Sequence, residues 1–516
     1  MASWRLGEQI FTLRRRGISN KEQKNIPARR QLPCVHKFRV TFAKPPAMPL
    51  SDFCADYSGL FGDVRLARRG EAIWQRLSLT PCSSIRQLSG NYAEQRAFYR
   101  FLLNEKVSET VLIEEATGRM KKLSTGRHLL CIQDTSEINL IKHKDRLQPN
   151  SGLGRSDNSE SGCCFKVHPG LVIDAYSSHL LGYSHIKVFH RPEERPNRIA
   201  RNYKKQEIQE KESFKWIEVA QQSKIVLNDA ASVTFIEDRE GDIYEQFAIV
   251  PDDKFHLLVR SRSTRNLSDG TSLYVSIQDA PLAGIYQVEI PTDKRKNQYK
   301  RTATIELRFM KCELQCPAHL VGKGYPNTIE VWCIAATEID CPTSNPIDWK
   351  LITTHRINTW EDAILMIEWY GMRWYIEQSF RLLKKQGFGV EESELESGWA
   401  IRKLVIMQLT ALLKILQMNI AYSEPEGGQP IEEVFDSKEI QVLHLVNKKF
   451  QGKTLRLGNH NDPLTTKWAA WIIGRLGGWK GYDSQGPPGV IILKRGLERL
   501  AYIIEGIDLG KDMYTR

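Results

Sequence analysis

The sequence predicts an α/β protein whose core carries a β-rich insertion and is flanked by helical N- and C-terminal regions. Two mostly apolar runs, residues 129–132 and 233–236, have the length of strands buried on both faces, although periodicity alone does not exclude buried helices. Residues 263–354 alternate apolar and polar side chains between Pro, Gly and Asp turns, which is typical of half-buried strands. Residues 48–126 and 401–420 instead repeat apolar side chains at helical spacing.

The overall composition suits a protein that binds a polyanion. The chain has 516 residues, a formal net charge of +12 and a pI of about 9.1. This length allows several domains with sizeable cores. No window of 18 consecutive apolar residues occurs, so no membrane span is predicted. The ten cysteines lack paired zinc-finger spacing, which indicates reduced thiols of a cytosolic protein and argues against structural zinc.

The positive charge is concentrated at the N-terminus. Residues 1–47 contain eleven Lys or Arg and two Asp or Glu, so they supply nine of the twelve net positive charges. They show no clear apolar period, and Met48 directly precedes a well-patterned segment. The segment is interpreted as a disordered basic arm or an upstream start-site extension, with a DNA-contacting arm as the alternative.

Residues 48–126 predict a helical N-terminal domain. Leu66, Ile73 and Leu77 recur at helical spacing, and residues 91–104 form a second helical pattern. Basic side chains on other faces of such helices can contact a phosphate backbone, although each is equally compatible with ordinary solvated charge. These side chains are Arg65, Arg68, Arg69, Arg96 and Arg100.

Each of the two predicted core strands leads toward an aspartate. Residues 129–132 lead to Asp134, and residues 233–236 lead to Asp238. The carboxyl end of a buried strand is where α/β sheets usually place their chemistry. Either aspartate alone is also compatible with a turn or helix-cap role.

A third acidic residue, Glu377, belongs to the run EWYGMRWYIEQSFRLLKKQG. This run contains good helix formers and no proline, which predicts one helix that ends near Gly387. Tyr370, Arg373, Glu377 and Lys384 have offsets of 0, 3, 7 and 14, which places them within about 60° on one helical face. A carboxylate there can hold a divalent metal, and the cations can hold phosphate oxygens. The alternative is a solvated, salt-bridged helix face.

Asp134, Asp238 and Glu377 together supply three carboxylates, two from strand ends and one from a helix. Such a set can hold two divalent cations about 4 Å apart, which orient a water and stabilise both oxygens of an in-line phosphoryl displacement. The combination therefore predicts metal-dependent phosphoryl transfer.

The same residues resemble a known signature. The pattern Tyr-x2-Arg-x3-Glu-x6-Lys, formed here by Tyr370, Arg373, Glu377 and Lys384, is similar to the YREK signature of bacterial DDE transposases of insertion-sequence family four, the Tn-five-like group. The resemblance extends from about Met48 to the C-terminus.

The contexts of both aspartates carry the same resemblance. The run IQDTS around Asp134 looks like the group's first acidic motif, and DREGDI, beginning at Asp238, looks like its second. The resemblance implies an RNase H-like catalytic core in which Asp134, Asp238 and Glu377 form the catalytic triad. It implies two Mg²⁺ or Mn²⁺ ions per active site as cofactors.

The resemblance also implies DNA contacts outside the triad. Trp349 lies 28 residues before Glu377, like a tryptophan on which Tn-five-like enzymes stack a flipped base, and core packing is the alternative for it. The run Gly62-Asp63-x-Arg65 resembles the group's end-binding domain. The residues expected to bind phosphate or DNA are Tyr370, Arg373, Lys384, Arg260, Arg262, Trp349, Arg65 and Arg69.

The expected domain organisation combines these patterns. The final segment contains wide apolar helical faces, and the resemblance favours a dimerisation role for it. The expected divisions are an extension at 1–47, a helical DNA-binding domain at 48–126, a first core part at 127–262, a β-rich insertion at 263–354, a second core part at 355–395 and a helical C-terminal region at 396–516.

The implied function is cut-and-paste DNA transposition. The protein would bind double-stranded DNA at terminal inverted repeats, nick it to leave a 3′-OH, pass through a hairpin intermediate and join the ends to target DNA. It would act as a homodimer in a synaptic complex, without a membrane partner, in the bacterial cytoplasm at the nucleoid. The alternatives are a metal-dependent nuclease of the same fold without strand transfer, and an inactive or inhibitory end-binding protein.

Overall fold

A computed structural model describes most of the chain as two compact units. The basic segment 1–47 lies outside the described residues, so the expectation for it stays a prediction. The β-rich unit comprises Tyr203–Ile217 and Ser232–Trp374, and the helix-rich unit comprises Ala47–Asn202, Glu218–Ala231 and Tyr375–Arg516. The described residues are 54–157, 162–192, 206–290, 301–342, 346–423, 428–451, 458–482 and 485–514.

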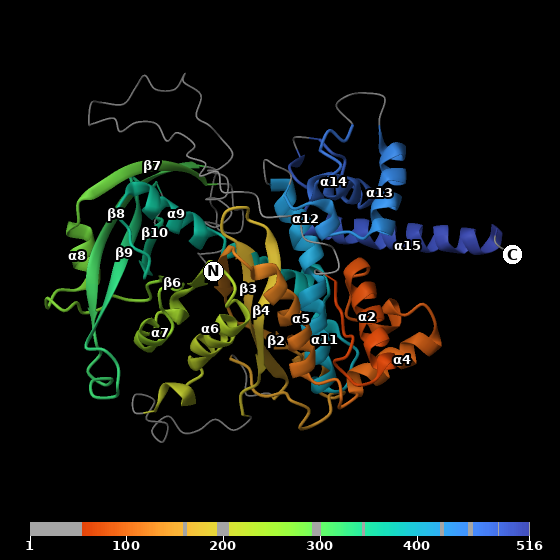
Figure 1. Cartoon of the computed structure of the whole chain (residues 1–516), viewed down its shortest axis with the longest axis horizontal. Helices are drawn as coiled ribbons and strands as arrows, with labels where there is room; N and C mark the ends of the chain where they lie inside the picture. Colours follow the sequence, from red (N-terminus) through yellow and green to blue (C-terminus); the bar gives the residue numbers. More distant parts are fainter. Residues whose placement is uncertain are drawn as a thin grey trace. The chain divides into compact units, whose positions relative to one another are not determined.

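The sheet of the helix-rich unit is organised around its longest strand, β3 (Figure 1). One edge of β3 pairs antiparallel with both β1 and β2, and the other edge pairs antiparallel with β4. The predicted strand at residues 129–132 is confirmed by β1, where Leu129, Leu130 and Ile132 have no exposed surface. The strands are β1 (His128–Gln133), β2 (Ser136–Asn139), β3 (Cys164–Asp174) and β4 (Leu180–Phe189).

Helices cover this sheet and form both predicted helical regions. The N-terminal pattern is confirmed by α2, whose start is capped by Asp63 accepting from the Arg65 N–H, and whose Ile73 and Leu77 are fully buried. Helix α5 packs on β4, and α11 packs on α2, α4 and α5. The helices of this unit are α2 (Val64–Leu79), α3 (Ile85–Leu88), α4 (Tyr92–Leu103), α5 (Glu109–Ser124), α10 (Trp374–Arg381), α11 (Gly398–Ala411), α12 (Leu413–Ser423), α13 (Ser437–Phe450), α14 (Thr466–Leu476) and α15 (Val490–Tyr514).

Two buried cations on α11 fasten the N-terminal helices to the rest of the helix-rich unit. Lys403 donates through Nζ to the carbonyl oxygens of Leu102 and Asn104, at 3.0 and 2.9 Å, and so satisfies groups left open where α4 ends. Arg402 donates through Nη2 to Glu109 Oε2, at 2.8 Å, at the first residue of α5. Charges buried in this way persist only because each is paired.

The β-rich unit contains one sheet with the order β5-β6-β10-β9-β8-β7. Strands β5 and β6 are parallel, and the other neighbours are antiparallel. The strands predicted for the insertion are confirmed by β7, β8 and β9, and β10 joins them to β6 in the same sheet. The elements are β5 (Ser232–Glu237), α7 (Tyr244–Ile249), β6 (Phe255–Arg260), α8 (Leu273–Asp279), β7 (Leu282–Ile290), β8 (Arg301–Gln315), β9 (Thr328–Ile339), β10 (Asp348–Thr353) and α9 (Trp360–Gly371), and α6 (Phe214–Val226) has residues in both units.

The helical prediction for the apolar residues 401–420 is confirmed by α11 and α12, which are separated at Leu412. Residues Gly398–Tyr422 are long and apolar enough to cross a membrane, but 94% of their most apolar window is buried inside the protein. Core helices of soluble proteins meet the same criterion, so this stretch is weak support for a membrane span.

Candidate active site

Asp134 follows β1 directly, as predicted, and forms a two-residue corner with Thr135 before β2 begins. The Thr135 backbone N–H donates to Asp134 Oδ1 at 2.7 Å. Asp134 is half-buried and follows a strand whose last five residues are buried. Strand geometry therefore presents an oxygen ligand at this sheet end.

Asp238 occupies the equivalent position in the β-rich unit. It follows β5 directly, and its Oδ1 accepts from the Glu240 N–H at 2.8 Å, so it caps the short 3₁₀ helix η5 (Arg239–Gly241). The predicted placement of both aspartates after the last residue of a buried strand is therefore confirmed.

A buried carboxyl group, Glu237, stands directly behind Asp238. It has no exposed surface and accepts a hydrogen bond from the Gln246 amide. Burial raises the pKa of Glu237 well above its usual range. A Cβ built on Gly241 would lie 2.1 Å from Glu237 Oε2, so the turn after Asp238 needs glycine for close approach. Sequence reasoning missed Glu237 because it reads as the last residue of the strand.

Glu377 and its three companions do not lie on one continuous helix. Tyr370 lies in the last turn of α9, Arg373 lies in a connecting turn, and Glu377 lies on α10. Lys384 lies in η7 (Leu382–Gln386), which has π-helical bonding and ends at Gly387 as predicted. The single-helix prediction was wrong, because a tight turn and a wide turn both interrupt the 3.6-residue period.

The turn and the π segment have identifiable hydrogen bonds. The Arg373 N–H donates to the Tyr370 carbonyl at 3.1 Å, a tightened pattern that follows the weak helix former Gly371. The Phe388 N–H donates across the wide turn to the Leu382 carbonyl at 2.8 Å. Tyr370 and Arg373 belong to the β-rich unit, whereas residues from 375 onward belong to the helix-rich unit.

Glu377 and Lys384 are both shielded from water. Glu377 is 5% exposed, and Lys384 is half-buried. Burial lowers the pKa of Lys384, while the carboxylates of Glu391 and Glu137 act in the opposite direction. A desolvated cation of this kind gains more from an anionic partner than a solvated one does.

Four residues predicted to bind DNA come together in the β-rich unit. The Arg260 guanidinium lies 5.8 Å from the centre of the Trp349 ring, and the Trp349 and Tyr370 ring centres are 5.1 Å apart at 78°. Burial lowers the pKa of Arg260. Tyr370 acts in the opposite direction, and the charges of Arg239 and Arg373 lower it further. We call Arg260, Trp349, Tyr370 and Arg373 the basic–aromatic cluster.

One of the predicted DNA contacts, Arg262, has other surroundings. Arg262 has an exposed side chain, and its backbone N–H donates to Asp242 Oδ2 at 2.8 Å. Arg265 forms a further ion pair with Asp242. Sequence reasoning quoted the run DREGDI without assigning Asp242 a role, although a second acid four residues after Asp238 is a usable signal.

The donor types suit a hard divalent cation. Asp134 and Glu377 are contributed by the helix-rich unit and Asp238 by the β-rich unit. Carboxylate oxygens are the ligands that Mg²⁺ and Mn²⁺ prefer. Across the part of the chain that the structure describes, no group of three or more His, Cys, Asp or Glu side chains is assembled as a ready-made metal site.

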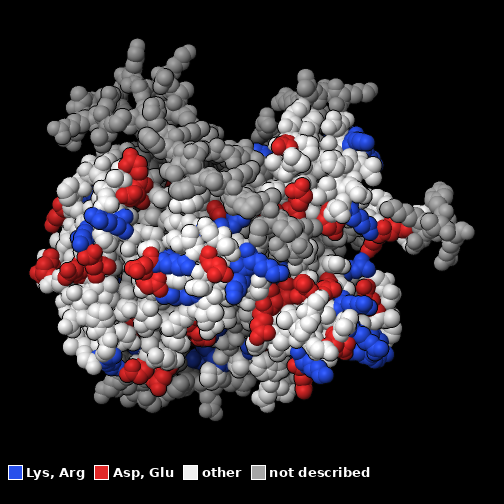
Figure 2. All heavy atoms as spheres, in the orientation of Figure 1, with Lys and Arg blue, Asp and Glu red and all other residues white. Residues whose placement is uncertain are grey.

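The N-terminal helices present basic side chains to solvent. Arg65 is exposed and Arg69 is half-buried on α2, and Arg96 and Arg100 are exposed on α4. Figure 2 shows Lys and Arg side chains interspersed with Asp and Glu over the face displayed. The exposed basic groups of α2 and α4 are therefore available for phosphate contacts.

Comparison with known families assigns both regions. Residues 59–107, which include α2 and α4, match the family described as transposase DNA-binding. Residues 175–414 match the transposase DDE domain, and this range contains Asp238, Glu377 and the basic–aromatic cluster. Asp134 precedes the second match, so the only support for it as a site residue is its position directly after β1 and the sequence pattern around it.

The two matches follow each other along one chain and together cover more than half of it. A domain that binds DNA and a domain that cleaves it with the help of metal ions are thus joined in one protein. This chain is a DDE transposase, a metal-dependent DNA-cleaving enzyme with an N-terminal transposase DNA-binding domain.

Proposed function

We propose that this transposase moves a DNA element by cut-and-paste and belongs to insertion-sequence family four. The observation that carries the proposal is the placement of its acids: Asp134 and Asp238 each directly follow a buried strand, and Glu377 is buried on α10. The YREK pattern around Glu377 supports the narrower family assignment, and an RNase H-like core is proposed on the same grounds.

Asp134, Asp238 and Glu377 would hold the divalent ions, Mg²⁺ or Mn²⁺. Two such ions, when bound, supply a water of lowered pKa and stabilise the attacking and leaving oxygens of an in-line displacement. The chain itself contributes positioning and charge neutralisation, which dominate phosphoryl transfer.

The reaction would proceed in four displacements at phosphorus. Water first attacks the phosphodiester at the transposon end, and the bond to the 3′ oxygen breaks to leave a 3′-OH. That hydroxyl then attacks the opposite strand and forms a hairpin, which a second water opens. The freed 3′-OH finally attacks target DNA, and each step exchanges one P–O bond for another.

The basic–aromatic cluster would hold the phosphate beside the cut. Arg260 is half-buried and Arg373 is 6% exposed, so both cations are partly or largely withdrawn from water. A partly desolvated cation gains more from an anionic phosphate than a solvated one does. Tyr370 can donate to a phosphate oxygen, and Lys384 supplies a further cation. The 4% exposure of Trp349 supports a packing role against Tyr370 rather than a stacking platform for a flipped base.

The remaining partners follow from the same proposal. The DNA-binding domain would recognise the terminal inverted repeats through contacts that include Arg65 and Arg69, and two copies of the chain would pair the ends in a synaptic complex. The protein would act in the bacterial cytoplasm at the nucleoid.

A paired-end cleavage and strand-transfer assay tests the proposal. Asp134→Asn, Asp238→Asn and Glu377→Gln should each lower cleavage by about a thousandfold, or about 4 kcal/mol, because a metal ligand is lost. Binding to end DNA should stay within about twofold, since phosphate contacts elsewhere carry it. Glu392→Gln, at an exposed carboxylate paired with Lys142, is the matched control and should cleave normally.

The products discriminate between the proposed function and its alternatives. Joining of pre-cleaved 3′-OH ends to target DNA is expected. Cleavage without joining would identify a nuclease, and end binding without either reaction would identify an inactive end-binding protein. Undiminished cleavage by one of the three variants would remove that residue from the triad.

A further inference from the structure

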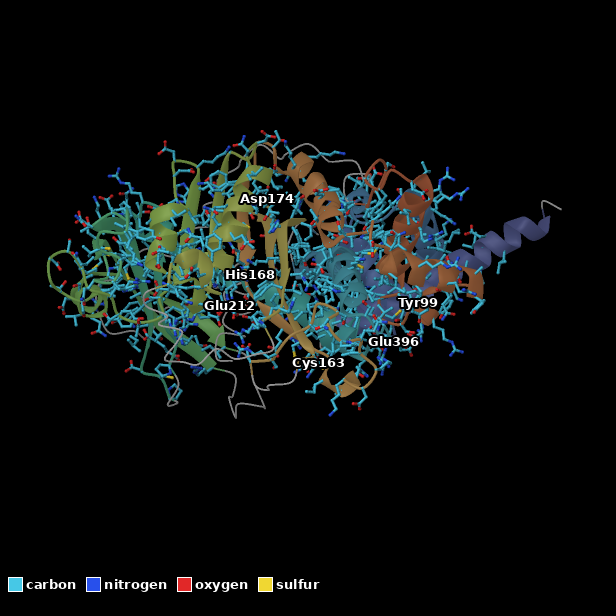
Figure 3. The ribbon with its side chains drawn as sticks, turned by 90° about the horizontal axis from the view of Figure 1, so that it is seen from below. Tyr99, Cys163, His168, Asp174, Glu212 and Glu396 are labelled. Atoms are coloured by element: carbon cyan, nitrogen blue, oxygen red, sulfur yellow. The ribbon has the colours of Figure 1, made fainter. Side chains whose placement is uncertain are left out.

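The register of β3 leaves two positions facing the corner formed by Asp134 and Thr135. Gly170 of β3 pairs with Gln133, the last residue of β1, and Val167 pairs with Ser136, the first residue of β2. His168 and Pro169 therefore stand opposite Asp134 and Thr135, where the ladder changes from one strand to the other. Figure 3 labels His168 among the strands, with Asp174 at the end of the same strand.

The imidazole of His168 binds both neighbours of Asp134. Its Nε2 lies 3.0 Å from Gln133 Oε1, and its Nδ1 lies 2.8 Å from Thr135 Oγ1. Because a carbonyl oxygen only accepts, Nε2–H donates to Gln133 and Nδ1 accepts from the Thr135 hydroxyl. Thr135 in turn donates its backbone N–H to Asp134 Oδ1. One side chain thus fixes the residues before and after Asp134.

Stability alone does not explain this arrangement. His168 and Gln133 have no exposed surface, and the Gln133 Nε2 group has no hydrogen-bond partner among the described residues. An unsatisfied buried donor costs about 1–3 kcal/mol, whereas an apolar pair of the same shape would avoid that cost. The backbone ladders to β1, β2 and β4 already hold β3 in place.

We propose that His168 is a positioning residue for Asp134: it orients the Gln133–Thr135 corner so that the Asp134 carboxylate is pre-set to bind the divalent ion. This inference rests on the proposed function, in which Asp134 is a metal ligand. Groups that orient metal ligands from behind typically change metal affinity 10–100-fold when they are removed, which sets the expected size of the effect.

The two nitrogens of His168 can be tested separately. Asn places a polar atom close to Nδ1 and keeps the contact with Thr135, whereas Gln reaches close to Nε2 and keeps the contact with Gln133. His168→Leu removes both contacts. If the contact with Thr135 positions the Asp134 carboxylate, His168→Asn should retain Mn²⁺ affinity and His168→Gln should lose it. Thr135→Val removes the hydroxyl but keeps the N–H, and should reproduce the His168→Leu defect.

The primary measurement is Mn²⁺ binding to the full chain on end DNA, followed by electron paramagnetic resonance. We expect His168→Leu to raise the Mn²⁺ Kd at least about tenfold, with end-DNA affinity unchanged and with the native near-UV circular dichroism retained. His168→Asn should restore most of the affinity. The Mn²⁺ concentration for half-maximal cleavage should shift in parallel. His185→Leu, at a half-buried histidine on β4, is the matched control and should leave the Mn²⁺ Kd unchanged.

A double-variant cycle completes the test. His168→Leu combined with Thr135→Val should be no worse for Mn²⁺ binding than either change alone, because both break the same link. Unchanged Mn²⁺ affinity in folded His168→Leu, or full additivity in the cycle, would overturn the inference. If His168→Leu does not fold, Thr135→Val with normal Mn²⁺ affinity overturns it equally.

The proposed function and this inference fail differently. Asp134→Asn measured beside these variants should lose Mn²⁺ binding. Normal binding and cleavage by Asp134→Asn would refute the metal-ligand assignment itself. Loss of Mn²⁺ binding in Asp134→Asn without loss of Mn²⁺ binding in His168→Leu would refute only the positioning role of His168.

Discussion

At the scale of single residues, Trp349 is held by one aromatic contact and one cation–π contact. Its indole packs edge-on against Tyr370 and beneath the Arg260 guanidinium, and only 4% of it is exposed. Aromatic and cation–π contacts of this kind each contribute about 0.5–2 kcal/mol beyond the burial of apolar area. The ring therefore supports the geometry of Tyr370 and Arg260.

Trp349→Ala should lower the free energy of unfolding by about 3–5 kcal/mol, because a buried aromatic side chain leaves a cavity. Trp349→Phe should lose less, since it refills much of that volume. Chemical denaturation measures both. Trp399, which is 45% exposed, provides the control, and its replacement by Ala should cost less. Normal stability of Trp349→Ala with a selective defect at the hairpin step would instead establish the base-stacking role.

The acidic residues of the proposed triad were easier to find in the sequence than the residues that surround them. Asp134, Asp238 and Glu377 stand in recognisable patterns after strands or within the signature helix. His168 stands in an apolar run with no periodic signal, and its contacts lie 33 and 35 positions away. Its position depends on the register of β3 against two strands, which a single sequence does not encode locally.

At the scale of elements, the segment from Tyr370 to Lys384 contains a turn and a π-helical stretch that were not predicted from the sequence. Gly371 is a weak helix former, but Met372 and Arg373 are good ones, so local propensity does not by itself predict the turn between α9 and α10. The helical character of this segment and its end near Gly387 were predictable, because both depend on nearby residues: helix formers without proline, followed by a glycine. The interruption depends on packing, which overrides local preference.

The turn after β5 offers a test at the same scale. Gly241→Ala should lower the free energy of unfolding by about 1–3 kcal/mol, because its Cβ would overlap the buried Glu237 carboxyl group. Cleavage should fall as well, since Asp238 caps the same turn. Gly118→Ala is the matched control: this exposed glycine within α5 has open space around it, and alanine there should add about 0.5–1 kcal/mol. Equal stability of the two variants in thermal denaturation would contradict the close-approach argument.

At the scale of the whole molecule, stability should depend on two imidazoles, one in each unit. Burial lowers the pKa of His185 and of His256 below the ordinary value of 6.5, with nearby carboxylates acting in the opposite direction. The unfolded chain then binds more protons than the folded chain below that pH. Stability is therefore present near neutral pH and is lost as the pH falls below about 6.5.

We expect the Tm to fall between pH 7 and pH 5, and the double variant His185→Gln/His256→Gln to show a shallower fall. Thermal unfolding followed by circular dichroism in buffers of matched ionic strength measures the slope. An identical slope in the double variant would exclude these two histidines as the source.

The α/β class and the strands of the insertion were predictable, whereas the course of the sheet was not. Alternation marked β7, β8 and β9 correctly, because each strand carries its own pattern. The pairing of β10 with β6, which makes the insertion continuous with β5, joins segments about ninety positions apart. Such pairings are decided by tertiary packing and leave no local trace.

The buried lysine and arginine on α11 limit how this protein can be recombined. Lys403 closes the end of α4, which lies within the DNA-binding match, yet it is encoded about three hundred positions later, within the DDE match. The two regions match separate families in sequence, but they are joined in the structure by this buried contact. A chimera that exchanges the N-terminal region to redirect DNA recognition needs a compatible α11 from the same parent. A crossover placed between residues 107 and 175 separates Lys403 from the carbonyl groups of Leu102 and Asn104 that it binds.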